Sequence, residues 1–277
     1  MDLPVRSPNL LMGCDFSCSP SRRKPIVLAT GISCEDQVEL VDLEKLISLD
    51  SFEGWLRLKR DWVGVFDFPF GLPRELVEKL GWPMQWLELV NHYASLTRID
   101  IRDTFTSFCN ARPVGRKFAH RGTDKSSGSS PSMKWVNPPV AFMLHAGIPR
   151  LLAAGVHLPG LHLGDCRRVG LEGYPGMLAR TALGRRSYKS DNKAKQNVQR
   201  LIARKDLINA MEKGQIGLGL CLKVTHIQRS VLINDASGDS LDAVACLIQA
   251  AWAVKQGPPD YGMPPGRDGL EGWIVTA

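Results

Sequence analysis

The sequence predicts an α/β fold in which helices flank a mixed sheet. Short apolar runs of strand length alternate with stretches of helical periodicity, in the order strand, strand, strand, helix, strand, helices, strand, helix. Hydrophobic residues make up 44% of the 277 residues and charged residues 23%, which is ordinary for a globular protein and argues against disorder. We expect one domain over residues 8–277, interrupted by a helical insertion at residues 74–160.

The first part of the chain supplies most of the expected strands. Apolar runs at residues 10–15, 26–30 and 37–41 are separated by Ser, Pro, Arg and Gly, which indicates strands joined by turns. Residues 51–60 carry apolar side chains at helical spacing, which predicts a helix. The compact apolar run at residues 62–66 stops at an aspartate and predicts a buried strand.

Helical patterns dominate the insertion. They lie at residues 74–80, 84–96, 99–109 and 139–154, with little strand character between them.

We expect a mobile loop at residues 112–134 of the insertion. Residues 122–132 hold five serines, two glycines and a proline. Such a composition buries too little apolar surface to order itself.

The last part of the chain returns to strand character at residues 166–172. A short helix is expected after Pro175, because proline suits the first turn of a helix. The final helix is expected at residues 239–255, with its apolar side chains on one stripe. Small residues such as Ala243 and Cys246 would let this helix approach the sheet closely.

Five acids lie at the ends of predicted elements. Asp15, Asp67 and Glu172 each end an apolar run, and Asp239 and Asp242 begin the final helix, three residues apart and nearly on one face. In open α/β sheets, ligands bind at the edge where strands end. Acids that converge there repel one another unless a cation neutralises them, and oxygen ligands suit Mg²⁺ or Mn²⁺. Taken singly, each acid is better explained as a structural residue than as a catalytic one: any of them can be a surface residue at the end of a strand, and Asp239 or Asp242 can cap the helix.

The charge of the chain is concentrated in one segment. Lys and Arg number 35 and Asp and Glu 28, a net charge of +7. Residues 185–205 contain eight Lys or Arg and one acid, Asp191, so their excess of seven equals that of the whole chain. Such a segment suits a polyanionic partner, and the alternative is a solvated helix face.

Cysteine usage and hydropathy indicate a cytoplasmic protein without a membrane anchor. The seven cysteines are scattered without CxxC pairs, which predicts reduced thiols and no structural disulfide. The first residues lack the long apolar core of a signal peptide. No apolar run approaches the roughly 18–20 residues needed to cross a bilayer.

Several motifs resemble the family of predicted ribonuclease-H-like nucleases known as domain-of-unknown-function family 429. The resembling stretches are GCDFSCSPSRRKPIVLA from Gly13, VFDFPFGLP from Val65, LEGYPGMLAR from Leu171, SYKSD from Ser187, LDAVACLIQAAWA from Leu241 and LEGWIV from Leu270. The resemblance implies a ribonuclease-H-like fold whose carboxylates hold two divalent cations. By position, these carboxylates are Asp15, Asp67 and Asp242, with Glu172 as a fourth.

The resemblance therefore implies a metal-dependent nuclease that hydrolyses phosphodiester bonds with two Mg²⁺ or Mn²⁺ ions. Asp15, Asp67, Glu172 and Asp242 are the expected catalytic residues, and Asp239 is an additional expected metal ligand. The partner is DNA or RNA, and endonuclease and exonuclease action both stay open. The basic residues expected to contact phosphates are Arg22, Arg23, Lys24, Lys189, Lys193, Lys195 and Arg200.

Two other classes of function stay open from the sequence. An ATP-dependent phosphotransferase of the actin-like or sugar-kinase-like class also begins with an aspartate at a strand end. Such proteins use a glycine-rich turn to hold phosphate, whereas Phe16 and Ser17 follow Asp15 here. The second alternative is a noncatalytic nucleic-acid-binding protein, for which the basic segment at residues 185–205 would suffice.

Overall fold

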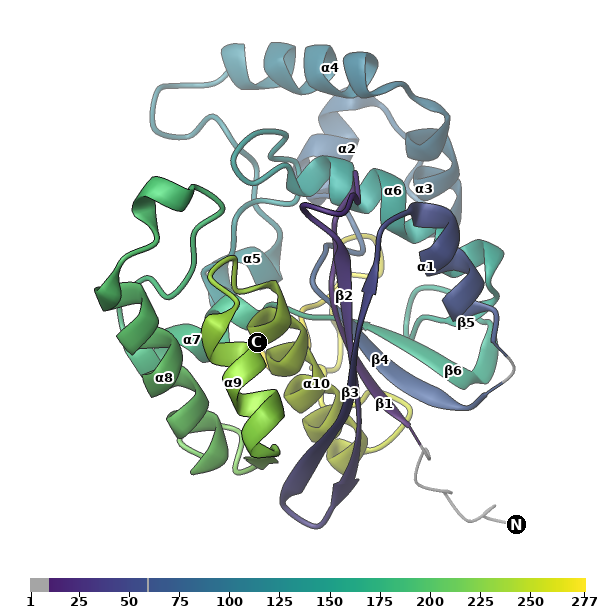
Figure 1. Ribbon diagram of the computed structural model, residues 1–277. Coiled ribbons are helices and arrows are strands. Elements are labelled where there is room, and N and C mark those ends of the chain that lie inside the picture. Colours follow the sequence, from purple (N-terminus) through teal and green to yellow (C-terminus); the bar gives the residue numbers. More distant parts are fainter. Residues whose placement is uncertain (1–9, 59) are drawn as a thin grey trace, which may run out of the picture.

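A seven-stranded mixed sheet forms the centre of the protein (Figure 1). The computed structural model describes residues 10–58 and 60–277, so residues 8 and 9 of the expected domain lie outside the described part. The strands are β1 (Leu11–Asp15), β2 (Ile26–Cys34), β3 (Gln37–Leu46), β4 (Trp62–Phe66), β5 (Val156–His157), β6 (Asp165–Glu172) and β7 (Cys221–Lys223).

The topology of the sheet brings three strand ends to one edge. The strands follow one another in the order β5-β6-β4-β1-β2-β3-β7, and β1, β4 and β6 are parallel neighbours. Cys14 lies in register with Phe66, and Phe66 lies in register with Glu172. The backbone N–H of Asp67 donates to the Cys14 carbonyl at 2.9 Å. The carboxyl ends of these three strands therefore lie side by side.

Ten α-helices lie within the described residues. They are α1 (Leu49–Leu56), α2 (Arg74–Leu80), α3 (Trp86–Ser95), α4 (Arg98–Asn110), α5 (Gly122–Ser127), α6 (Val140–Ala153), α7 (Pro175–Leu183), α8 (Val198–Glu212), α9 (His226–Asn234) and α10 (Asp239–Gln256). A single 3₁₀ turn, η1 (Lys193–Lys195), precedes α8. None of the helices in the described ranges combines the length and the apolar character that a membrane span requires.

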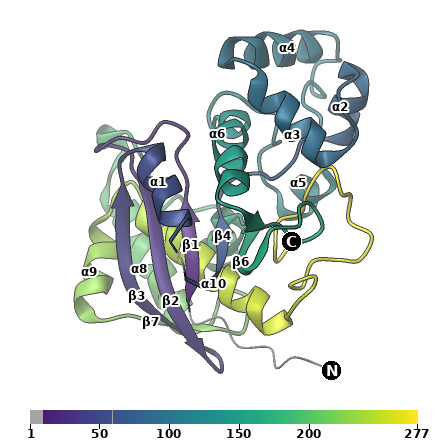
Figure 2. The ribbon, with the colours of Figure 1, turned by 90° about the vertical axis from the view of Figure 1, so that its right-hand side faces the viewer.

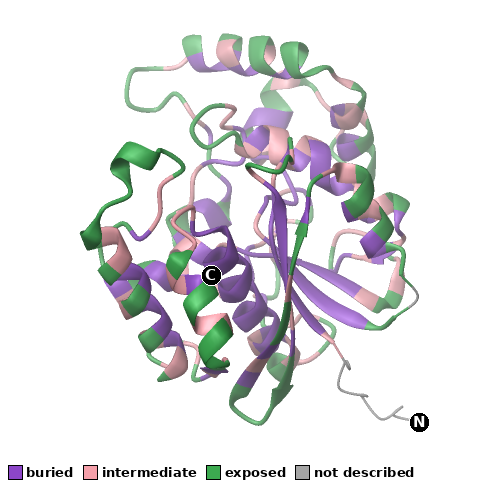
Figure 3. Cartoon of the chain, in the orientation of Figure 1, coloured by how far each residue is buried: buried purple, intermediate pink, exposed green. Residues whose placement is uncertain are grey.

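Helices cover both faces of the sheet (Figure 2). On one face, α10 packs across β1, β2 and β4, α7 lies against α10, and α8 lies against α7. The opposite face carries α1 and α6, and α3 of the insertion packs on α6. Side chains alternate along β1, so Leu11 enters one core while Met12 and Cys14 enter the other. The central strands are buried between these two layers of helices, and α10 is itself largely buried (Figure 3).

Gly13 of β1 allows α10 to lie directly on the sheet. A Cβ atom at this position would lie 2.0 Å from the Ala243 carbonyl oxygen and 2.2 Å from the Leu247 nitrogen. Both atoms belong to the backbone of α10, so they cannot move aside as a flexible side chain can. This close contact fixes the distance between the end of β1 and the first turn of α10.

The segment expected to be a mobile loop has a different structure. Residues 122–127 form α5, and the side chains of Arg121 and Asp124 are buried. The Arg121 guanidinium pairs with Asp124 at 2.8 Å and with Glu172 of β6 at 2.6 Å. The expected loop is a helix over residues 122–127, because buried ion pairs rather than apolar contacts hold this segment.

A late segment of the chain, residues 268–275, fastens the insertion to the sheet. Its Glu271 carboxylate accepts hydrogen bonds from the backbone N–H groups of Arg74, at 2.8 Å, and Gly122, at 2.9 Å. Its Val275 N–H donates to the carbonyl of Glu172 at 2.8 Å. The first turns of α2 and α5 are thereby held against the end of β6.

Candidate metal centre

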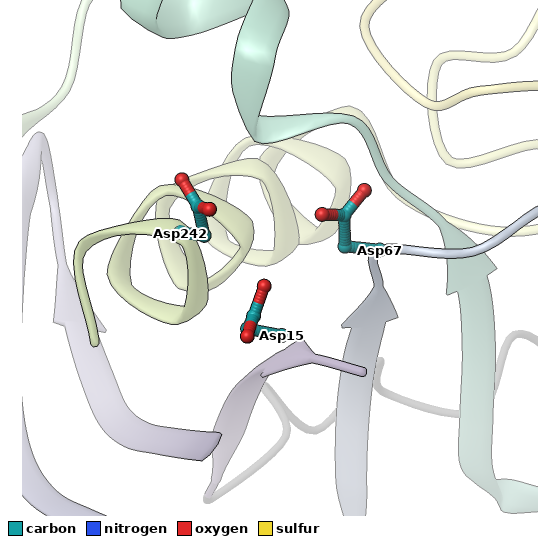
Figure 4. Close-up of side chains that lie close together, drawn as sticks. All are labelled: Asp15, Asp67 and Asp242. Carbon is teal, nitrogen blue, oxygen red and sulfur yellow. The ribbon is translucent and has the colours of Figure 1, made fainter. Parts of the chain in front are cut away.

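Three of the five expected acids come together at the sheet edge. One carboxylate oxygen from each of Asp15, Asp67 and Asp242 lies within 4.8 Å of the other two. Figure 4 shows the three carboxylates turned toward a common point between β1, β4 and α10. We call these residues the triad. Oxygen ligands at this spacing can share a divalent cation.

Local structure explains how distant residues meet in the triad. Asp15 ends β1, and Asp67 directly follows the parallel neighbour β4. Asp242 lies in the first turn of α10, which begins after Gly238 at a positive φ of 79°. The amino-terminal end of a helix carries a partial positive charge, which stabilises a carboxylate there.

The Asp15 carboxylate is buried without a hydrogen-bonding partner at one of its oxygens. The residue is 7% exposed, and no described group donates to the buried Oδ2 atom. Burial raises the pKa of Asp15 well above its ordinary value, and the nearby carboxylates of Asp242 and Asp239 raise it further. A buried acceptor that lacks a donor is suited to a cation.

The environment of Asp67 also disfavours the ionised form of its carboxyl group. Burial, and then the charge of Asp242, raise the pKa of Asp67 from 3.8 to about 7. The residue is partly exposed, and it contributes to the wall of a cavity of about 670 Å³. Burial and the repulsion between neighbouring carboxylates therefore favour protonation of Asp15 and Asp67 when no cation is bound.

The pKa of Asp67 predicts how an amide at this position changes stability. Because the folded-state pKa lies above the unfolded-state value, ionisation of Asp67 costs nothing below about pH 3.8 and destabilises the fold increasingly up to about pH 7. Asp67→Asn removes this cost. In EDTA at pH 8, we expect the free energy of unfolding to rise by up to about 4 kcal/mol.

Urea unfolding at pH 4 and pH 8 measures this effect. The gain should be largest at pH 8 and close to zero at pH 4. Asp61→Asn is the matched control, because Asp61 precedes the opposite end of β4 and is exposed. A gain of equal size at both pH values would contradict the proposed cause.

Asp242 is held by two side chains from the loop after α7. Its carboxylate accepts hydrogen bonds from the Tyr188 hydroxyl and from the Lys189 ammonium group. Burial, and then the Asp242 charge, raise the pKa of Tyr188, so its hydroxyl stays a donor. Burial alone would lower the pKa of Lys189, but the Asp242 charge outweighs it and the pKa is raised. Lys189 therefore remains charged beside the triad.

Asp239 belongs to a separate ion pair outside the triad. Its carboxylate binds the Lys24 ammonium group at 2.6 Å, and Lys24 also contacts Asp191 at 3.1 Å. Lys24 and Lys189 were expected to contact phosphates, but the structure places Lys24 against Asp239 beside the triad and Lys189 against Asp242 of the triad. Both act as internal counter-ions.

The other expected phosphate contacts lie on the surface around this site. Arg22 and Arg23 are exposed in the turn before β2, and Lys193 and Lys195 are exposed on η1. Arg200 of α8 is partly buried and donates to the Lys189 carbonyl at 3.1 Å. Arg200 therefore positions the loop that carries Lys189.

Glu172 does not join the triad, contrary to expectation. Both of its carboxylate oxygens accept hydrogen bonds from Arg121, at 2.6 and 2.8 Å, and one also accepts from the Phe70 N–H at 2.9 Å. Burial raises the pKa of Glu172, and Arg121 opposes that rise. No local motif marks Arg121 as this partner, because 51 residue positions separate it from Glu172 in the chain.

In comparisons with known proteins, no family model, no curated protein and no solved structure matched this chain.

Proposed function

We propose that this chain is a metal-dependent nuclease with a ribonuclease-H-like fold. In this proposal, Asp15, Asp67 and Asp242 hold Mg²⁺ or Mn²⁺, and the substrate is a nucleic acid whose phosphodiester bonds are hydrolysed. The observation that carries the proposal is the buried Asp15 carboxylate, which accepts no hydrogen bond at Oδ2 from the described residues and lies against two further carboxylates. Glu172 and Asp239 are left out of the ligand set because they do not belong to the group of carboxylates that lie within 4.8 Å of one another, and Arg121 and Lys24 engage them instead.

The residues of the triad and its surroundings have distinct roles in this proposal. A pair of divalent cations would supply activation of the attacking water and stabilisation of the leaving oxygen. Asp15 and Asp242 are buried and fixed by β1 and α10, so they hold their positions when charge enters the site. Lys24 and Lys189 reduce the negative charge that the substrate phosphate meets. The exposed basic side chains of η1 offer backbone contacts beyond the site.

The turn after β1 favours a nuclease over the phosphotransferase alternative. Phe16 and Cys18 of this turn belong to the core, and they are 3% and 9% exposed. A phosphate-binding turn instead presents backbone N–H groups to a ligand, which glycines permit.

The experiment that tests the proposal is a cleavage assay with controlled metal content. Labelled single-stranded and double-stranded DNA and RNA are incubated with the purified protein in Mg²⁺, Mn²⁺ or EDTA. We expect cleavage of at least one substrate with Mn²⁺ or Mg²⁺ and none in EDTA. Cleavage that persists in EDTA would overturn the proposed metal dependence, and a complete lack of cleavage with either metal would overturn the nuclease.

The basic segment at residues 185–205 predicts a salt-dependent contribution to the binding of nucleic acid. Replacing Lys193, Lys195 and Arg200 with Ala should weaken binding of all nucleic-acid sequences about equally, because phosphate contacts carry no sequence information. The slope of log K against log salt should flatten by about 0.7 to 0.9 for each phosphate that the variant no longer neutralises. A Lys193→Ala/Lys195→Ala protein isolates the exposed pair from Arg200, which also holds the Lys189 loop.

The control for this measurement removes two charges elsewhere. Lys213 is exposed just past the far end of α8, roughly 20 Å from the first turn of α8 by helix length, and Lys223 is exposed on β7. Their replacement with Ala should leave the slope unchanged. An equal slope for the Lys193/Lys195 variant and the wild type would show that this segment is a solvated surface.

A further inference from the structure

A cavity of about 670 Å³ lies beside the triad, on the side of Asp67. Ligand pockets in proteins typically measure roughly 300 to 1,000 Å³, so this one has room for a small organic group. Its walls come from both parts of the fold, since Val140 and Met143 belong to α6 of the insertion and Tyr174 precedes α7. The triad needs only the end of the cavity at Asp67, so the remaining volume has no role in metal binding.

The cavity wall has an apolar part and a cationic part. Val140, Met143 and Ile274 contribute apolar surface, and Arg180 and Arg185 contribute positive charge. The carboxylates in the wall are Asp67 of the triad and Glu172, which Arg121 neutralises. Within the described residues, Arg185 makes no ion pair. A matching ligand therefore combines an apolar portion with negative charge.

Tyr174 supplies an aromatic surface that the structure holds in place. The Arg180 guanidinium lies 5.2 Å from the centre of the Tyr174 ring and donates to its hydroxyl at 3.1 Å. Arg180 also donates to the Ser127 carbonyl at the end of α5, so it cannot swing freely. The backbone also limits the ring, because a Cβ atom at Gly176 would lie only 2.8 Å from its hydroxyl end. An aromatic ring fixed in this way suits stacking with a flat group.

We propose that the cavity binds one nucleotide unit of the substrate, with its base against Tyr174 and the apolar wall and its phosphate toward Asp67. This proposal rests on the proposed nuclease function and specifies its substrate. A nucleotide is the ligand class that joins a flat apolar base to a phosphate within one unit. The base must leave its neighbours to enter the cavity, so the substrate is single-stranded or unpaired at the cleavage point.

Binding of small ligands by calorimetry in Mn²⁺ tests the proposal directly. The probes are adenosine 5′-monophosphate, ribose 5-phosphate and inorganic phosphate. Stacking of a base on an aromatic side chain contributes about 1 to 3 kcal/mol, so the nucleotide should bind roughly 10-fold to 100-fold more tightly than ribose 5-phosphate. Equal affinity of the nucleotide and ribose 5-phosphate would overturn the proposal, because the base would then contribute nothing.

Two variants locate the binding in the cavity. Val140→Trp places a ring into the cavity from the partly exposed first residue of α6 and should reduce nucleotide affinity at least 10-fold. Tyr174→Ala should do the same by removing the stacking surface, whereas Tyr174→Phe should retain most of the affinity. Val41→Trp, on the exposed side of β3, is the matched control and should bind like the wild type. Unchanged affinity in both Val140→Trp and Tyr174→Ala would overturn the proposal.

Two titrations distinguish a failure of the cavity proposal from a failure of the proposed nuclease function. Titration with Mn²⁺ alone reports on the triad, and the same ligand series in EDTA reports on the cavity. Metal binding without any preference for the nucleotide rejects the cavity assignment and leaves the metal centre intact. Preference for the nucleotide without metal binding supports the cavity and rejects the metal centre.

Discussion

Asp15→Asn should abolish Mn²⁺-dependent cleavage of nucleic acid and leave the protein folded. Asparagine has nearly the shape of aspartate but removes the charge that holds a cation. We expect the cleavage rate to fall by at least about 10³-fold, which corresponds to roughly 4 kcal/mol of transition-state stabilisation. Without metal, the variant should melt at the same temperature as the wild type or higher, because burial and neighbouring charges disfavour ionised Asp15.

Cleavage assays, Mn²⁺ titration and thermal melts on one preparation check this expectation. Asp239→Asn is the informative comparison, because Asp239 is an adjacent buried acid that pairs with Lys24 outside the triad. This variant should lose much less activity than Asp15→Asn. Full metal-dependent cleavage by Asp15→Asn would remove the triad as the site, and equal losses in both variants would return Asp239 to the ligand set.

Gly13→Ala should destabilise this fold strongly, although it adds only one methyl group. The new Cβ would lie about 2 Å from backbone atoms of α10, so α10 and β1 must separate. Overpacking of a core commonly costs about 1 to 3 kcal/mol, and a contact with fixed backbone belongs at or above the upper end. Separation of α10 from β1 also moves Asp242 away from Asp15, so Mn²⁺ affinity should fall together with stability.

Urea denaturation with Gly54→Ala as the control measures this effect. Gly54 lies in α1, is exposed, and has open space within 4 Å of the position that a Cβ atom would take. Alanine at this position should stabilise the helix by about 0.5 to 1 kcal/mol. A Gly13→Ala protein as stable as the wild type would mean that α10 is not packed directly on β1.

The position of acids at element ends predicted five candidate ligands, and the three residues of the triad are among them. β4 occupies residues 62–66 as predicted, and β1 ends at Asp15 as predicted, so the two aspartates follow from hydropathy alone. The start of α10 at Asp239 was also predicted and confirmed. The two strand ends and their acids are the part of the site that local sequence can specify. Parallel pairing of β1 and β4 then brings Asp15 and Asp67 together.

The choice of partner for each remaining acid could not be predicted. Glu172 and Asp239 have the same local signature as the triad, namely an acid at the end of an apolar element. Arg121 and Lys24 remove them from the ligand set, and both pairings span long stretches of chain. A buried ion pair depends on three-dimensional proximity, so no pattern of spacing announces it.

The sequence also did not predict α8 as an amphipathic helix. Helix α8 buries Arg204 among apolar residues, because the guanidinium donates to the carbonyls of Ile233 and Tyr188. The sequence therefore shows a basic segment rather than an amphipathic stripe. Strand β2 extends beyond its predicted end toward the exposed hairpin turn, and β3 extends at its opposite end, over residues 42–46. Backbone pairing between the two strands rather than burial sustains most of these added residues.

The fastening of the insertion by residues 268–275 has a thermodynamic consequence. Phe105 and Leu144 of the insertion share one continuous core with Met12 and Phe66 of the sheet. The insertion and the sheet therefore melt as one cooperative unit rather than as a rigid body with a detachable lid. A ligand in the cavity touches both parts, so its binding energy adds to the stability of the entire chain, by RT ln(1 + [L]/Kd).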